Sequence, residues 1–104
     1  MMAGKEEMLQ EYLEKIKQNV LSELAEENVA VALFGSAAVG GDTCASDVDI
    51  AVIPRGDWKR WKLSSLRQDL EDLNVPYSVD LVDFSTVSNS FKTTALTSAV
   101  WWRT

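Results

Sequence analysis

The sequence contains no histidine and a single cysteine, Cys44. Without histidine the chain cannot form a Ser-His-Asp triad, a mixed Cys/His zinc site or an imidazole general base. One cysteine cannot build a disulfide framework, which is the usage expected in a reducing cytoplasm. Any catalysis must therefore rely on carboxylates, hydroxyls, backbone amides and metal ions.

Long apolar runs are also missing. No segment approaches the about 20 consecutive apolar residues that a membrane-spanning helix needs. The segment Met1 to Gln18 is charged throughout and lacks the apolar core of a signal peptide. With only five glycines and two prolines, the sequence shows no flexible linker and no repeat. We expect a soluble cytoplasmic protein, without a membrane partner, in which the 104 residues form one domain over positions 1–104.

Positive charge is scarce, because the formal net charge is −6. Such a balance disfavours a surface that holds duplex nucleic acid by neutralising its phosphates. It is compatible with a nucleotide substrate, because bound magnesium reverses the local charge of an acidic site. Basic residues gather between Arg55 and Arg67, around Trp58 and Trp61, where the spacing favours an amphipathic helix with core tryptophans over an RNA-binding patch.

The spacing of apolar residues indicates two helices and three strands. Steps of three and four residues predict helices from Lys5 to about Glu27 and from Trp58 to Leu73. The apolar run Val29–Phe34 predicts a strand buried on both faces, and Val48–Ile53 and Tyr77–Phe84 predict two more. This order predicts an α/β fold, in which a small mixed sheet with a three-stranded core is flanked by helices.

The tail after the third predicted strand is ambiguous. Its Thr and Ser content weakens a helix, although Phe91–Trp102 could form one packed on the sheet. The adjacent Trp101 and Trp102 cannot both face one core, so we expect one of them to be exposed. An exposed terminal tryptophan is typical of a partner surface or of a cap over the sheet.

The pattern that carries chemistry is Asp47-Val48-Asp49 at the start of the second predicted strand. Side chains two apart on a strand point to the same face, so the two carboxylates should project together. They repel each other unless a cation lies between them, and hard oxygen ligands of this kind suit magnesium. Taken alone, an Asp-x-Asp pattern is more often two solvated aspartates at the end of a strand than a metal site.

Two further features agree with a metal site. Gly35-Ser36 follows the first predicted strand, where glycine permits close approach of the backbone to a phosphate and the serine hydroxyl adds a donor. Asp80 lies in the middle of the third predicted strand, where a charge is costly unless it is paired or coordinates something. Asp83 lies on the opposite face, and we expect it to cap a helix or lie at the surface. Three carboxylates beside a phosphate-binding turn are typical of two-metal phosphoryl transfer.

The stretch Leu33-Phe34-Gly35-Ser36 through Ser46-Asp47-Val48-Asp49-Ile50-Ala51-Val52 resembles the signature of the DNA polymerase β-type nucleotidyltransferase superfamily. The short length and the segment Val79-Asp80-Leu81-Val82-Asp83 are similar to its minimal nucleotidyltransferase branch. This likeness covers about half of the chain, and the combined motif is far more specific than its parts.

The resemblance implies a role for each motif residue and a reaction. Gly35 and Ser36 would bind the triphosphate, Asp47 and Asp49 would bind both of two magnesium ions, and Asp80 would complete the metal site that activates the acceptor. The implied reaction transfers a nucleoside monophosphate, AMP from ATP or the counterpart from another nucleoside triphosphate, to an acceptor hydroxyl.

The resemblance also implies a partner. Members of this branch commonly pair with a small all-helical HEPN-type protein in toxin–antitoxin systems, and some add AMP to it. The alternative is a catalytically weak nucleotide-binding antitoxin that neutralises a HEPN-type toxin by binding. An RNA acceptor and a homo-oligomer stay open. Kanamycin-type enzymes share the motif but carry an additional drug-binding domain, which disfavours that function for this chain.

One departure from the family pattern bears on activity. Many members have a basic residue just after the Gly-Ser pair, whereas this sequence has Ala37 and Ala38. The substitution removes a positive contact to the phosphates. Magnesium would then have to neutralise more of the phosphate charge.

Overall fold

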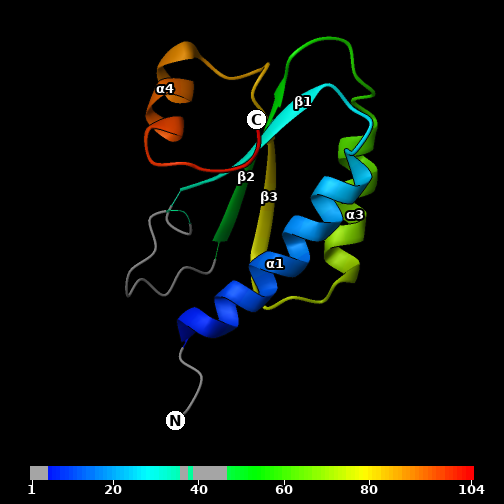
Figure 1. Cartoon of the computed structure of the whole chain (residues 1–104), viewed down its shortest axis with the longest axis vertical. Coiled ribbons are helices and arrows are strands. Elements are labelled where there is room, and N and C mark those ends of the chain that lie inside the picture. Colours follow the sequence, from blue (N-terminus) through cyan, green and yellow to red (C-terminus); the bar gives the residue numbers. More distant parts are fainter. Residues whose placement is uncertain (1–4, 36–37, 39–46) are drawn as a thin grey trace.

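The computed structural model describes residues 5–35, 38 and 47–104. Three helices and a four-stranded sheet account for most of this part of the chain (Figure 1). In chain order the elements are α1 (Lys5–Glu23), β1 (Val29–Phe34), β2 (Asp47–Pro54), α3 (Lys62–Asp72), β3 (Ser78–Asp83), α4 (Asn89–Thr97) and β4 (Val100–Arg103). None of the described helices is long and apolar enough to cross a membrane.

The sheet is mixed, with the strand order β3-β2-β1-β4. β1 pairs antiparallel with both β2 and β4, whereas β2 and β3 run parallel. The expected α/β architecture with a mixed sheet is therefore confirmed, but the sheet has four strands where the sequence predicted a core of three. The parallel pair joins the two strands that carry the aspartates, and α3 provides the crossover between them.

The fourth strand replaces the second half of the helix considered for the tail. α4 ends at Thr97, whose hydroxyl bonds the carbonyl of Thr93 in its own helix. The chain then turns, and Trp101 pairs with Ala32 at the edge of the sheet. Local spacing could not show this strand, because its hydrogen bonds are made with a segment almost 70 residues earlier in the chain.

β1 is the centre of the core, and all six of its residues are buried as predicted. Val31 and Leu33 face α1 and α3, which contribute buried leucines, Ile16 and Val20 to the larger apolar cluster. Ala32 and Phe34 point to the other face, where α4 packs. Because α4 is short and lies over one end, this helix covers only part of the second face (Figure 1).

α3 begins at Lys62 rather than at the predicted Trp58. The buried carboxylate of Glu27 explains the delay, because it accepts the backbone N–H of Lys59 at 2.8 Å and pairs with Lys62 at 3.0 Å. The preceding segment is thereby anchored to the end of α1 instead of joining the helix. Trp58 packs against the core, but Trp61 is 64% exposed, so the prediction of two core tryptophans was wrong for Trp61.

Candidate functional site

The register of the sheet places the three predicted carboxylates on one face. Asp49 in β2 lies directly opposite Asp80 in β3, and Asp47 lies opposite Ser78. Residues opposite one another in neighbouring strands share a face, as do residues two apart along one strand. We call this surface, which carries Asp47, Asp49 and Asp80, the aspartate face. It is also the face on which α4 packs.

The three carboxylates differ in their exposure to solvent. Asp47 and Asp80 are exposed, and Asp49 is half-buried between them. Burial raises the pKa of Asp49, and the negative charges of Asp80 and Asp47 raise it further. The carboxylates are thus close enough to repel one another, and a cation at this position would relieve the repulsion.

Gly35 approaches this group from the end of β1. Its φ of +77° lies in the left-handed region that favours glycine. A Cβ atom at this position would collide with Oδ2 of Asp49 and would lie 3.3 Å from its Cγ. The backbone of Gly35 therefore passes directly beside the Asp49 carboxylate.

Ala38 is the one described residue between Gly35 and Asp47. The backbone N–H of Ala38 donates to the Gly35 carbonyl at 3.1 Å, and the Ala38 side chain packs against the larger core cluster. Ser36 and Ala37 lie outside the described residues, as does the loop 39–46 that contains Cys44. The contact of Ser36 with a phosphate therefore stays a prediction.

The donor chemistry of the aspartate face fits a divalent cation, because three carboxylates supply hard oxygen ligands. Within residues 5–35, 38 and 47–104, no three carboxylate or thiol side chains are already gathered around one point. Metal binding would therefore require the aspartate side chains to turn toward one another. The shared face and the glycine beside it are preformed, whereas the coordination geometry is not.

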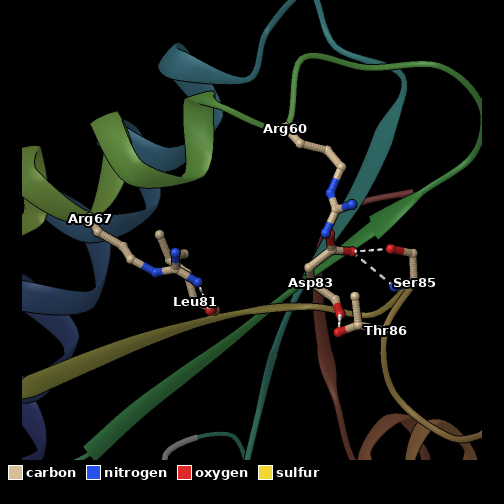
Figure 2. A network of polar contacts seen from close by, with 6 residues as sticks. All are labelled: Arg60, Arg67, Leu81, Asp83, Ser85 and Thr86. Carbon is tan, nitrogen blue, oxygen red and sulfur yellow. Dashed lines mark hydrogen bonds and ion pairs between the residues drawn. The ribbon is translucent and has the colours of Figure 1, made fainter.

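Asp83 does not belong to this group. It lies opposite Val52 on the other face of the sheet and is only 7% exposed. Its Oδ1 accepts hydrogen bonds from the backbone N–H of Ser85 at 2.9 Å and from the Ser85 hydroxyl at 2.7 Å (Figure 2). The expectation of a helix cap or a surface group was wrong. Asp83 instead stabilises the turn that follows β3, and Ser88 caps α4.

The charge of Asp83 is balanced by Arg60, which reaches down from the segment before α3 (Figure 2). The guanidinium lies 2.9 Å from Oδ2, an ion pair without the alignment of a hydrogen bond. Burial by itself raises the pKa of Asp83, but the Ser85 hydrogen bonds and the Arg60 charge outweigh it and hold the pKa below its ordinary 3.8. Asp83 therefore stays ionised in a structural role.

Phenylalanine side chains next to the carboxylates were not singled out from the sequence. Phe34 lies directly opposite Asp49 across the β1–β2 pair and so shares the aspartate face. Its ring packs edge to face against Phe84 and Phe91, with centroids 5.3 Å and 6.1 Å away. In the sequence, only the place of Phe34 just before Gly35 indicated that its ring would lie near the aspartates. The pairing of β1 with β2 cannot be inferred from local spacing.

Comparison with known protein families identifies the family of this fold. The family profile described as polymerase beta, nucleotidyltransferase, matches residues 11–101, which include every described aspartate of the candidate site. The chain belongs to the polymerase β nucleotidyltransferase family. This nucleotidyltransferase has no match among curated protein sequences.

Solved structures place the nucleotidyltransferase in the minimal branch of that family. A protein described as a minimal nucleotidyltransferase is 27% identical, with a TM-score of 0.68, and the match covers 86% of this chain and 92% of the other. A toxin–antitoxin structure with AMP-PNP contains a chain that is 25% identical, with a TM-score of 0.62, and the match covers 83% of this chain and 71% of the other.

A third structure shares the fold. It is the complex of a tri-AMPylated HEPN toxin from Shewanella oneidensis with its MNT antitoxin. The identity is 22% and the TM-score 0.59, over 86% of this chain and 70% of the other. The predicted membership of the minimal nucleotidyltransferases is confirmed by these matches together with the family profile.

Proposed function

We propose that this nucleotidyltransferase moves a nucleoside monophosphate, AMP from ATP, onto the hydroxyl of a small all-helical HEPN-type partner in the cytoplasm, with two magnesium ions. The observation that carries the proposal is the pairing of Asp49 with Asp80 beside Gly35 on the aspartate face. The AMPylated toxin and the bound AMP-PNP of the similar structures support the choice of donor and acceptor.

Each residue of the site has a task in this proposal. Asp47, Asp49 and Asp80 would hold the ions, and the bare Gly35 backbone, with Ser36, would hold the triphosphate. Magnesium, when bound, supplies the positive charge that neutralises the triphosphate and lowers the pKa of the attacking hydroxyl. Asp80 is exposed on the edge strand β3, so a hydroxyl of a large acceptor can approach it from solvent.

The reaction itself is a single displacement at phosphorus. The acceptor oxygen forms a bond to the α-phosphorus while the bond from the α-phosphorus to the bridging oxygen of the β-phosphate breaks. Pyrophosphate leaves with the electron pair, and the proton of the hydroxyl passes to water. In this displacement no side chain of the protein acts as a nucleophile.

Transfer of label from ATP tests the proposal. The protein is incubated with magnesium, ATP labelled at the α-phosphate, and either a helical partner protein or RNA as acceptor. We expect label on the helical protein, and about 100-fold less with Asp49→Asn, because a charge that holds the metal is lost. Asp57→Asn, which changes an exposed aspartate before α3, is the matched control and keeps activity. No transfer by the wild type, or equal transfer by Asp49→Asn, would count against the proposal.

A second candidate function is supported by the toxin–antitoxin complexes that share this fold. In this case the chain neutralises a HEPN-type toxin by binding alone, and the nucleotide site contributes little. The two functions differ in their dependence on the aspartates. If Asp47→Asn and Asp49→Asn still rescue growth of cells that express the toxin, binding is sufficient. Loss of rescue by both variants, with complex formation intact, indicates that transfer is required.

A further inference from the structure

Three phenylalanine rings form one cluster on the aspartate face. Phe34 comes from β1, Phe84 follows β3 and Phe91 belongs to α4, and each ring packs edge to face against the other two at centroid distances of 5.3–6.1 Å. Phe34 and Phe84 are buried, at 7% and 1% exposure. Phe91 is 44% exposed, so the cluster presents one ring to solvent.

The cluster adjoins the carboxylates. Phe34 is the direct cross-strand neighbour of Asp49, and Asp49 is in turn the neighbour of Asp80, so the three form one row across the sheet. The next row consists of Ala32, Ala51 and Val82. Phe91 packs on Phe34 and is therefore separated from the carboxylate row by a single aromatic ring.

The position of Phe91 is fixed rather than free. It lies in the first turn of α4, and its backbone N–H donates to the Ser88 hydroxyl, which caps the helix, at 3.1 Å. Its ring packs on the buried rings of Phe34 and Phe84, which restricts its rotation. A single exposed phenylalanine is common on protein surfaces. An immobilised ring beside a row of carboxylates is a different case, because it offers a preformed flat apolar surface next to a charged site.

From this arrangement we infer that Phe91, supported by Phe34 and Phe84, is the stacking surface for the base of the nucleoside triphosphate. The inference rests on the proposed function, which places the phosphates at the aspartates. Every nucleobase has a π face, so stacking on a phenylalanine binds all four bases and favours the larger purines. The chain would thus bind ATP and GTP more tightly than UTP and CTP.

Two ligands separate stacking from phosphate binding. Binding of a non-hydrolysable ATP analogue and of inorganic tripolyphosphate, which has no base, is measured by calorimetry with magnesium. Phe91→Leu keeps an apolar contact with Phe34 and Phe84 but removes the flat ring. We expect it to weaken binding of the ATP analogue about tenfold and to leave binding of tripolyphosphate unchanged.

Two further variants control for the fold and for exposed aromatics in general. Phe91→Tyr keeps the ring and should bind the ATP analogue as the wild type does. Trp101→Leu removes a tryptophan of similar exposure, 41%, from the edge strand β4, and should leave both ligands unaffected. A thermal unfolding curve confirms that each variant is folded.

The outcomes distinguish this inference from the proposed function. If the wild type binds neither ligand with magnesium, the proposed function and the inference both fail. If the wild type binds both ligands and Phe91→Leu weakens both equally, or neither, only the stacking surface is refuted. An equal loss with Trp101→Leu would refute it as well.

Discussion

At the scale of single residues, the contact between Gly35 and Asp49 determines the shape of the candidate site. The glycine adopts a φ of +77° and leaves no space for a Cβ beside the carboxylate. Gly35→Ala should therefore lower the free energy of unfolding by about 1–2 kcal/mol from the backbone alone. It should also weaken magnesium-dependent nucleotide binding, because the Asp49 carboxylate has to move. Urea unfolding and calorimetry measure the two effects.

Gly56→Ala is the matched control for this substitution. An added Cβ there would meet only Nδ2 of Asn28, at 2.5 Å, which is the far end of an exposed side chain that can turn away. We expect a smaller loss of stability and unchanged nucleotide binding. Equal effects of the two substitutions on binding would show that the approach of Gly35 to Asp49 has no functional role.

The carboxylate of Asp49 should cost stability when no divalent cation is present. Burial and the charges of Asp80 and Asp47 raise its pKa, so its ionised form is less favourable in the folded chain than in the unfolded one. This penalty is absent below the ordinary pKa of 3.8 and complete once the pH exceeds the raised value. In EDTA at pH 7, Asp49→Asn should therefore be more stable than the wild type in urea unfolding. Lower stability of Asp49→Asn would contradict the stated repulsion.

The site residues were predictable to different degrees. Asp47 and Asp49 could be assigned to one face because strand side chains alternate with a period of two. That Asp80 shares this face follows only from the register of β2 and β3. Asp83 could be assigned to the opposite face by the same rule. Its ion pair with Arg60 was not predictable, because the position of Arg60 depends on how the segment before α3 is anchored.

At the scale of elements, Asp83 and Arg60 join the end of β3 to the segment before α3. Asp83→Asn should lower the free energy of unfolding at pH 7 by about 1–2 kcal/mol, because a buried hydrogen-bonded charge with a cationic partner is lost. The folded-state pKa of Asp83 is lowered, so its contribution is complete above 3.8 and disappears as the pH falls through the lowered value. The difference between the wild type and Asp83→Asn in urea unfolding should therefore shrink only below about pH 4.

Arg60→Ala separates the two sources of that stability. The side chain of Arg60 is 60% exposed, so solvent screens its ion pair with Asp83. Arg60→Ala should therefore lower the free energy of unfolding by less than about 1 kcal/mol, which is about half of the effect of Asp83→Asn. The hydrogen bonds from Ser85 remain in this variant. A larger loss for Arg60→Ala than for Asp83→Asn would show that the ion pair, and not the turn, is the main contribution.

The elements themselves were predictable where the signal was local. β1 was predicted with its observed bounds, because its six apolar residues are buried on both faces. The start of α3 was predicted four residues early, because the spacing of Trp58 and Trp61 mimics a helix while Glu27 holds Lys59 in another conformation. β4 was missed, since an edge strand of four residues depends on its partner.

At the scale of the whole molecule, Arg103 connects the last strand to the first helix. Its guanidinium donates to the carbonyl of Leu24 and, at 2.9 Å, to that of Glu27, just beyond the end of α1. Arg103→Ala should lower the free energy of unfolding by about 1.5–3 kcal/mol, because two charge-assisted hydrogen bonds are lost. Arg103→Lys should restore only part of it, since an ammonium cannot donate in the same fork. Urea unfolding of both variants is the measurement, with the exposed Arg55→Ala as the control.

If Arg103→Ala is as stable as Arg55→Ala, the C-terminal strand is not fastened to α1 by this contact. The comparison also bears on β4, which has few other contacts with the helices. β4 carries both adjacent tryptophans. Trp101 is exposed and Trp102 packs against the core, which confirms the expectation that one of the two would be exposed.

The division of the molecule into two unequal faces agrees with a transferase that acts on a protein. α1 and α3 cover one face of the sheet, and the short α4 packs on part of the other (Figure 1). Asp47 and Asp80 on that second face are exposed. We therefore propose that the aspartate face transfers a nucleoside monophosphate to a partner.

Intact mass spectrometry of a small all-helical partner tests this claim most directly. The partner is co-expressed with the wild type, with Asp49→Asn and with Asp57→Asn. We expect the partner to gain the mass of one or more nucleoside monophosphates with the wild type and with Asp57→Asn, and none with Asp49→Asn. An unmodified partner in every sample, or the same gain with Asp49→Asn, would contradict it.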